Sequence, residues 1–456
     1  MGFLEIILFP VYVFIFYLFV TYKRKRTQDP LLKKYLVQGF WVKIISTIAI
    51  TIFNWYISPG DSVTLYYPEG VGIYRMILKD ADNLKWLYLP GTDFDLSLAA
   101  DSWNAGYFSN QGNYMVIKLV AVLSFFSFGR YSILQLLFSM IAFTGMWKLF
   151  KFFYEQNPHL HKQIAISILF FPTVVFWSSG ILKDPLCMSM LGWMTYAIYK
   201  GYHKKNKIIL NSFIAIIAGY ILYVIKSYIL FSYLPFFIMY LILINLSFIK
   251  NSFTRVMTIG LISIFVLGGL IIVAKRFEVE MGKFAVEKLA ESVKTQQKNF
   301  INMADKAESS FSLEFEYDGS LGSLAKMAPF AINATLFRPY LWESKKISTL
   351  LSSLESLALM VLTLYVLIST GPLQMGKIIF KYPLVTYCFF YSILFALFVG
   401  ATTLNFGTLV RYKIPAMPFY LIALFSILYY AKAKKNKPTG KSGPVVVAEV
   451  KDLSKQ

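Results

Sequence analysis

Long apolar runs alternate with short polar connectors along most of this chain. The runs consist mainly of Leu, Ile, Phe, Val and Tyr, and at about 18 residues each they can cross roughly 30 Å of hydrocarbon as helices. They do not alternate apolar and polar residues, as the strands of a membrane barrel do. The pattern therefore predicts an all-α polytopic membrane protein. The predicted spans cover residues 3–22, 38–57, 131–147, 164–178, 185–200, 209–225, 229–248, 256–274, 349–370, 383–402 and 414–431.

The connectors between these runs indicate the topology. Those rich in Lys and Arg fall on one side, which we assign to the cytoplasm because cytoplasmic loops carry an excess of these residues. Segment 113–129 is expected to be re-entrant or interfacial, since a full span there would move every later basic connector to the other side. The result is about eleven spans, with the N-terminus outside and the C-terminus inside. The basic connectors are 23–37, 148–163, 200–208, 249–255, 371–382 and 432–456.

Composition supports a membrane protein and argues against nucleic-acid binding. Of the 456 residues, 57% are hydrophobic and 15% are charged, whereas soluble domains carry about 25% charged residues. The net charge of +21 comes from basic residues beside apolar runs, which is a topology signal. Basic residues 23–26 follow the first apolar run, so we do not expect a cleavable signal peptide. Cys187 and Cys388 lie in apolar runs and indicate no metal site.

The domain organisation follows from the two long connectors, which face outward in this topology. Connector 58–112 holds seven acidic residues against three basic ones. Connector 275–348 opens with a charged, amphipathic helical stretch. The polar, Lys-rich segment 433–456 predicts a disordered cytoplasmic tail. We therefore expect a single transmembrane domain over residues 1–432.

Acidic residues of the first outward loop are the first candidates for chemistry. Asp61 lies in the turn PGDS at 59–62, directly after the second predicted span, and Glu69 follows shortly afterwards. A carboxylate at the membrane surface can take the proton from an acceptor hydroxyl. Asp61 can equally bond its own backbone in a Pro-Gly turn, so both interpretations stay open.

Basic residues near later outward loops are candidate phosphate ligands. Lys183 has no structural explanation, whereas its neighbour Asp184 precedes a proline at a helix start and is expected to cap that helix. Arg338, flanked by aromatic residues, either anchors its helix at the interface or clamps a diphosphate. Arg411 and Lys413 lie in a short outward loop against the positive-inside tendency, and an anionic ligand would explain them.

The central turns of the predicted spans contain almost no ionisable groups. Lys43 and Glu355 lie nearer the span ends, where long side chains reach the interface. Ion-coupled transporters usually need charged groups at mid-depth, so this distribution favours an enzyme with its site in the outward loops. The chain has no P-loop, nucleophile elbow or zinc framework. Asp93 and Asp95 form only a short D-x-D pattern, and we expect neither a metal nor another cofactor.

Three stretches resemble bacterial GT-C-type integral-membrane glycosyltransferases and the related O-antigen-type polysaccharide polymerases. They are PGDSVTLYY at 59–67, FPTVVFWSSGILKDPL at 171–186 and LVRYKIPAMPFYLIALFSIL at 409–428. In that superfamily an acidic residue of the first outer loop is catalytic or binds the acceptor, which implies Asp61, with Glu69 as a substitute. Basic residues near later outer loops contact the phosphates of a polyprenyl-linked donor. The matching positions are Lys183, Arg338, Arg411 and Lys413.

These observations predict a multi-pass enzyme of the bacterial cytoplasmic (inner) membrane. It would transfer a sugar or oligosaccharide from a polyprenyl-phosphate-type carrier to the hydroxyl of a glycan or lipid acceptor on the extracytoplasmic face. Such a reaction belongs to surface polysaccharide or glycoconjugate assembly, either as addition of one sugar or as joining of repeat units. The alternatives are a lipid or oligosaccharide transporter (flippase) and a non-catalytic membrane assembly subunit. No nucleic-acid partner is expected.

Overall fold

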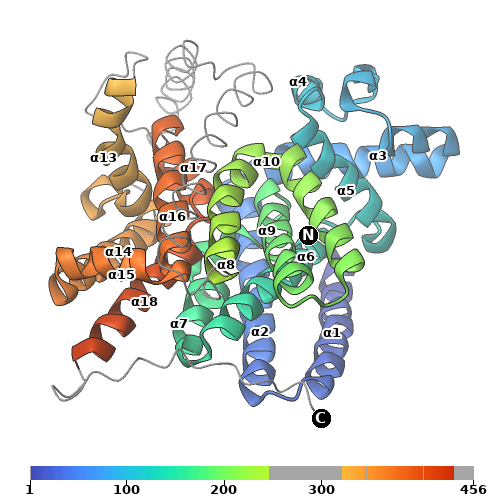
Figure 1. Ribbon diagram of the computed structural model, residues 1–456. Helices are drawn as coiled ribbons and strands as arrows, with labels where there is room; N and C mark the ends of the chain where they lie inside the picture. The colour runs from blue at the N-terminus through green and yellow to red at the C-terminus, as the bar shows by residue number, and fades with distance from the viewer. Residues whose placement is uncertain (1, 246–320, 345–346, 404, 436–456) are drawn as a thin grey trace.

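The computed structural model describes residues 2–245, 321–344, 347–403 and 405–435, and within these ranges the chain is helical without strands (Figure 1). Six of the described helices are long and apolar enough to cross a membrane, or seven if the bent pair at the C-terminus counts as one span. The prediction of an all-α multi-pass membrane protein is therefore confirmed. The count of eleven spans and the orientation of the termini stay predictions, and the predicted span 256–274 lies outside the described residues.

The elements fall into two stretches of sequence. The first comprises α1 (Phe3–Arg26), α2 (Pro30–Ile52), η1 (Phe53–Ile57), η2 (Ser62–Tyr66), α3 (Tyr67–Lys79), η3 (Ala81–Leu87), η4 (Gly91–Asp93), η5 (Leu96–Leu98), η6 (Ser102–Asn104), α4 (Ala105–Phe108), α5 (Gln111–Ser127) and α6 (Tyr131–Gln156). The second comprises η7 (Pro158–Leu160), α7 (His161–Ala165), η8 (Ile166–Phe170), α8 (Pro172–Trp177), α9 (Lys183–Ile198), η9 (Tyr199–His203), α10 (Ile208–Asn245), α13 (Leu321–Phe337), η11 (Leu341–Glu343), α14 (Ile347–Thr370), α15 (Pro372–Lys381), α16 (Pro383–Thr402), α17 (Phe406–Tyr412) and α18 (Met417–Lys435).

Several basic connectors meet at one end of the helical bundle, which we call the basic end. It contains the turn between α1 and α2, the segment after α6 and η9, and hydrogen bonds and an ion pair join these segments. The contacts are Tyr154–Asp29, Tyr35–His161, Lys200–Glu155 and Tyr430–Asn157. The helix α18 continues to Lys435, so the first residues of the predicted tail 433–456 are helical and the rest lies outside the described residues.

The opposite end, which we call the loop end, carries α3, α4 and both ends of α5 (Figure 1). The residue before α5, Asn110, lies beside Lys183 at the start of α9, with 3.5 Å between Asn110 Oδ1 and Lys183 Nζ. After α5 the chain enters α6, where the backbone N–H of Tyr131 donates to Glu5 Oε1 near the start of α1 at 3.1 Å. Because both ends of α5 lie at the loop end, α5 does not cross the bundle, as expected for a re-entrant or interfacial segment.

The helix α10 is broken at Lys226, whose φ of −152° and ψ of 78° are not helical. Its far end returns to the basic end, where Asn245 Oδ1 lies 3.3 Å from His203 Nδ1. The predicted spans 209–225 and 229–248 therefore correspond to two arms that meet at Lys226, as far as Asn245. Gly112 of α5 packs on this break, and a Cβ at that position would lie 2.8 Å from the carbonyl oxygen of Ile225.

Close packing of α6 against α9 holds the start of α9 in place. Gly145 of α6 faces Ser189 and Gly192 of α9, and a Cβ at either glycine would overlap the backbone of the other helix. Small residues at such crossings let helix backbones approach closely, which is a common way to pack helices in membranes. The first turn of α9, with Lys183 and Asp184, is therefore carried by a rigid helix pair.

The short helix α8 lies inside the bundle between two charged side chains. At its start, Glu355 of α14 accepts hydrogen bonds from the backbone N–H and the hydroxyl of Thr173, at 2.9 and 2.6 Å. At its end, Lys43 of α2 donates to the carbonyl oxygens of Ser178 and Val175, at 2.7 and 3.3 Å. A carboxylate at the N-terminus and an ammonium at the C-terminus both complement a helix dipole. These contacts position the loop that leads to Lys183.

The expectation that Lys43 reaches the membrane interface is wrong. The helix α2 begins at Pro30, eight residues earlier than predicted, so Lys43 falls in its middle and is only 1% exposed. The polar connector residues before position 38 obscured this, because a helix continues through polar residues wherever they reach water. Glu355 does lie near the start of α14, but its carboxylate turns inward to α8.

Candidate functional site

Segments that are distant in the sequence bring charged side chains together at the loop end. Asp184 is fully buried and lies between two cations. Its Oδ1 accepts a hydrogen bond from Lys226 Nζ at 2.5 Å, and its Oδ2 lies 2.9 Å from Arg411 Nε as an ion pair. Arg411 Nη2 also donates to Asp61 Oδ2 at 3.2 Å. Together with Lys183, these residues form what we call the charged cluster.

The members of the charged cluster come from interruptions and ends of helices. Lys226 lies at the break of α10, and Arg411 is in the last turn of α17, before a bend of 65° to α18. Asp61 precedes the π-helix η2, and Asp184 is in the first turn of α9. Irregular helical turns of this kind are frequent at functional sites. They allow side chains from several elements to converge at one place.

Asp184 does not cap α9, so that expectation is wrong. The N-cap position is Leu182, which makes no side-chain capping bond, and both carboxylate oxygens of Asp184 face the cations instead. Hydrogen bonds between charged groups are about twice as strong as those between neutral groups. A buried carboxylate with an ammonium and a guanidinium in reach therefore binds these groups rather than the backbone amides of the helix.

The charged cluster is closed on the side of Asp184 and open on the side of Asp61. The side chain of Asp184 is 0% exposed and that of Arg411 18%, whereas that of Asp61 is 49% exposed. The cluster has three basic and two acidic members, so it carries an excess of one positive charge when all five are ionised. Its open side thus presents a carboxylate to solvent next to an arginine.

Lys183 lies beside this opening, at the start of α9 and outside the helices that qualify as membrane spans. Its side chain is half-buried. Burial lowers the pKa of Lys183 to about 8, and the positive charge of Lys226 acts in the same direction. The ammonium group is therefore charged at neutral pH but loses its proton in a moderately alkaline solution.

Tyr66 of η2 is a buried neighbour of the cluster that connects η2 to α5. Its hydroxyl donates to Asn113 Oδ1 at 3.0 Å. Burial, together with the negative charge of Asp61, raises the pKa of Tyr66 well above its usual value. The phenol stays protonated, and its hydrogen bond to Asn113 holds η2, and with it the adjacent Asp61, against α5.

Glu69 lies outside the charged cluster and holds the first loop together. Its carboxylate is buried and accepts hydrogen bonds from the backbone N–H of Ala100 at 2.8 Å and of Asp101 at 3.0 Å. A third bond comes from Asn104 Nδ2 at 2.8 Å. Because these contacts occupy both oxygens, the geometry favours Asp61 over Glu69 as the residue that faces a substrate.

Arg338 and Lys413 also lie apart from the cluster. Arg338 is paired with Glu343 five residues later, with Nε 2.9 Å from Glu343 Oε1, and its guanidinium carbon lies 5.4 Å from the ring centre of Phe406. Lys413 is buried and donates to Ser356 Oγ of α14 at 3.3 Å. Of the six residues predicted from the sequence, the structure brings together Asp61, Lys183 and Arg411.

Two residues of the cluster were not among those six. Asp184 had been interpreted as a helix cap, and Lys226 had not been considered. A signal for Lys226 was present, because it lies in the three-residue connector between the predicted spans 209–225 and 229–248, on the outward side. A cation there runs against the positive-inside tendency in the same way as Arg411 does.

The described residues offer no group of three His, Cys, Asp or Glu side chains that could hold a metal ion. Asp95 of the D-x-D pattern instead accepts hydrogen bonds from the backbone and hydroxyl of Ser97, at 3.0 and 2.7 Å. The expectation that the protein needs no metal stays a prediction.

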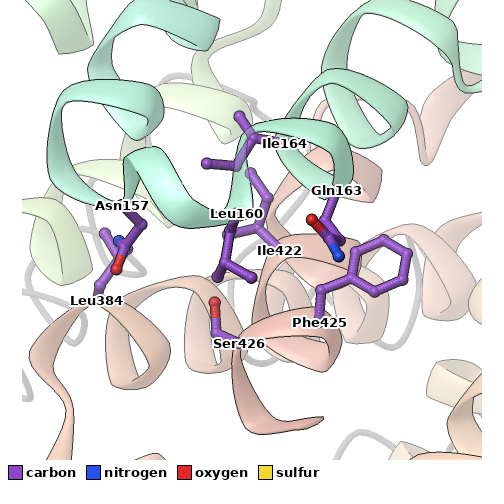
Figure 2. A pocket seen from close by; sticks show the side chains of 8 residues that line it. All are labelled: Asn157, Leu160, Gln163, Ile164, Leu384, Ile422, Phe425 and Ser426. Atoms are coloured by element: carbon purple, nitrogen blue, oxygen red, sulfur yellow. The ribbon is translucent and has the colours of Figure 1, made fainter. Parts of the chain in front are cut away.

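A small pocket lies at the basic end, away from the charged cluster (Figure 2). It encloses about 210 Å³ of space that is partly open to solvent. Mostly apolar side chains line it, so it has none of the charged chemistry of the loop end. The lining residues are Asn157, Leu160, Gln163, Ile164, Leu384, Ile422, Phe425 and Ser426.

The charged cluster has the chemistry of an anion-binding site with an adjacent carboxylate. Arginine and lysine side chains are the usual ligands of phosphate groups, and a half-exposed aspartate beside them can accept a proton from a second reactant. Comparison of the chain with family models, with curated proteins and with solved structures returns no match.

Proposed function

We propose that this protein transfers a sugar or oligosaccharide from a polyprenyl-phosphate-type lipid carrier to an acceptor hydroxyl at the extracytoplasmic face. The observation that carries the proposal is the juxtaposition of Arg411 with the half-exposed carboxylate of Asp61, at 3.2 Å. Phosphate binding and proton transfer are the two functions that this reaction requires of a protein, and residues suited to each lie side by side. The resemblance in the three sequence stretches supports the same function.

In the proposed reaction, Asp61 accepts the proton of the acceptor hydroxyl while its oxygen attacks the anomeric carbon of the donor sugar. The bond between that carbon and the carrier phosphate breaks, and the phosphate leaves with the bonding electrons. Lys183 and Arg411 stabilise the charge that develops on the phosphate, which lowers the barrier because these cations are already in place. Asp184 and Lys226 hold Arg411 in position.

The location of the cluster supports an extracytoplasmic reaction. It lies at the loop end, and the connectors rich in Lys and Arg meet at the other end of the bundle. By the positive-inside rule the basic end faces the cytoplasm. In a bacterium, the donor would therefore be presented at the outer leaflet of the cytoplasmic membrane, where surface polysaccharides are assembled.

We expect cells that lack this protein to accumulate lipid-linked sugar intermediates at the outer leaflet. If the enzyme joins repeat units, complete single units accumulate, whereas loss of a single-sugar transferase leaves units that lack one residue. Mass spectrometry of extracted lipid-linked sugars distinguishes the two cases. An unchanged pool of intermediates together with unchanged surface polysaccharide would exclude the proposed function.

Transport of a lipid-linked sugar is a second candidate, because the structure contains features that transporters use. The helix α10 is broken at Lys226, α17 and α18 meet at a bend of 65°, and Lys43 is buried in the middle of α2. Broken helices and buried ionisable groups often mark transport sites. If the protein is a transporter, the intermediates should accumulate at the inner leaflet, where a glycosidase added outside intact spheroplasts cannot reach them.

Binding of a polyprenyl phosphate is expected to weaken by about tenfold as the pH rises from 7 to 9, since a hydrogen bond to a charged group contributes roughly 1.5–3 kcal/mol. The pKa of Lys183 is about 8, so its ammonium is charged below this pH and neutral above it. Calorimetric titration with a short-chain polyprenyl phosphate measures the effect. The Lys183→Arg variant should bind equally at both pH values, because arginine stays charged. An equal loss in that variant would show that another group titrates.

A further inference from the structure

A second group of basic side chains lies at the basic end, on the surface formed by α1, α6 and α9. We call it the lysine–aromatic group. Lys148 of α6 lies over two rings of α9, with Nζ 4.5 Å from the ring centre of Trp193 and 4.8 Å from that of Tyr196. Lys151 and Lys200 lie 5.3 and 5.5 Å from the same Tyr196 ring.

The charges of this group are not balanced. Lys23 of α1 also acts electrostatically on Lys148, as do Lys151 and Lys200. The acidic member is Glu155, which lies 2.9 Å from Lys200 Nζ and accepts a hydrogen bond from the hydroxyl of Tyr196 at 3.0 Å. Four lysines against one glutamate leave an excess of three positive charges. Such an excess repels itself, and binding of an anion would relieve the repulsion.

The group faces out of the bundle, at the level where lipid headgroups are expected. Trp193 is partly exposed, and its indole N–H donates at 3.0 Å to the hydroxyl of Thr144, which is exposed on α6. On α1, whose described side chains are mostly exposed, Tyr22 is 55% exposed and lies beside Lys23. Tryptophan and tyrosine are enriched at the membrane–water interface, and α1 and α6 are both candidate spans.

We propose that the lysine–aromatic group binds the phosphate headgroup of an anionic phospholipid of the cytoplasmic leaflet. The ammonium groups would hold the phosphate, and the exposed aromatic side chains would contact the glycerol and the first part of the acyl chains. Free phosphate would gain the first set of contacts but not the second, so a lipid is the better match. This site is independent of the function proposed for the loop end, because none of its residues belongs to the charged cluster.

Lipid titrations of the full chain, purified in an uncharged detergent, test this proposal. Phosphatidylglycerol is expected to raise the midpoint of thermal unfolding and to appear as bound lipid in native mass spectra, whereas phosphatidylcholine is not. In a Lys148→Gln/Lys151→Gln variant the affinity for phosphatidylglycerol should fall by about tenfold or more, at roughly fivefold for each lysine near a membrane surface.

The matched control is a Lys204→Gln/Lys205→Gln variant, which removes the same charge from exposed positions at the same end. It should bind phosphatidylglycerol as the unmodified protein does. Equal loss in both variants would reduce the effect to general electrostatic attraction and overturn the proposed site, as would unchanged binding in the first variant. Stabilisation by inorganic phosphate as strong as that by phosphatidylglycerol would overturn the assignment to a lipid.

Discussion

Replacing Asp61 with asparagine is expected to lower glycosyl transfer by about 10²–10⁴-fold, the usual contribution of a general base. Asparagine has nearly the same shape and can still accept the hydrogen bond from Arg411, but it cannot take a proton from the acceptor. The ion pair between Asp61 and Arg411 is half-exposed, and such pairs contribute only about 0–1 kcal/mol to stability. The variant should therefore fold and insert normally, so its transfer rate in proteoliposomes reports on chemistry.

The control for this experiment is Asp93→Asn, which removes an exposed carboxylate from the same loop. It should retain full activity, and it also tests whether the D-x-D pattern contributes. Full activity of the Asp61→Asn variant would eliminate Asp61 as the base. It would also favour the non-catalytic assembly subunit among the alternative functions.

Replacing Asp184 with asparagine is expected to destabilise the protein by about 3–5 kcal/mol, the typical cost of removing one partner from a buried ion pair. Asp184 is fully buried and contacts both Lys226 and Arg411. Without its negative charge, two cations remain in a poorly solvated environment with only the exposed Asp61 to compensate them. Thermal unfolding of the detergent-solubilised protein measures the loss.

The Glu155→Gln variant is the control for Asp184, because it breaks a partly exposed ion pair with Lys200 at the other end of the bundle. We expect a loss of no more than about 1 kcal/mol there. If both variants unfold at the same temperature, Asp184 does not hold the cluster together. A second variant, Asp184→Asn/Lys226→Met, should recover part of the stability, since it removes one of the two uncompensated cations.

Most of the helical framework could be predicted from the sequence. The apolar runs matched described helices, and the two arms of α10 were predicted as separate spans even though a single helix of 38 residues connects them across the break. The position of α5 also followed from the sequence, because a crossing there would have scattered the basic connectors over both sides. The start of α2 was missed, and with it the burial of Lys43.

The site was predicted only in part. Asp61 and Arg411 were identified independently, from a turn and from a topological exception, although 350 residues separate them. Their contact could not be predicted, because no local pattern encodes the packing of η2 beside α17. Lys226 was missed although its position obeys the same rule as Arg411, and Asp184 was assigned the local role that its position before a proline suggests.

By itself, the sequence determined that this protein is a helical membrane protein and that its basic connectors differ in location from its acidic loop. Both properties depend on the hydrophobicity and charge of each segment, which act independently of how the segments pack. Only the tertiary structure decided which charged side chains neutralise one another and which remain open to a ligand. Burial of Asp184 between two cations, the pairing of Arg338 with Glu343 and the exposure of Asp61 all depend on contacts between elements, and side-chain environments arise only when those elements are packed.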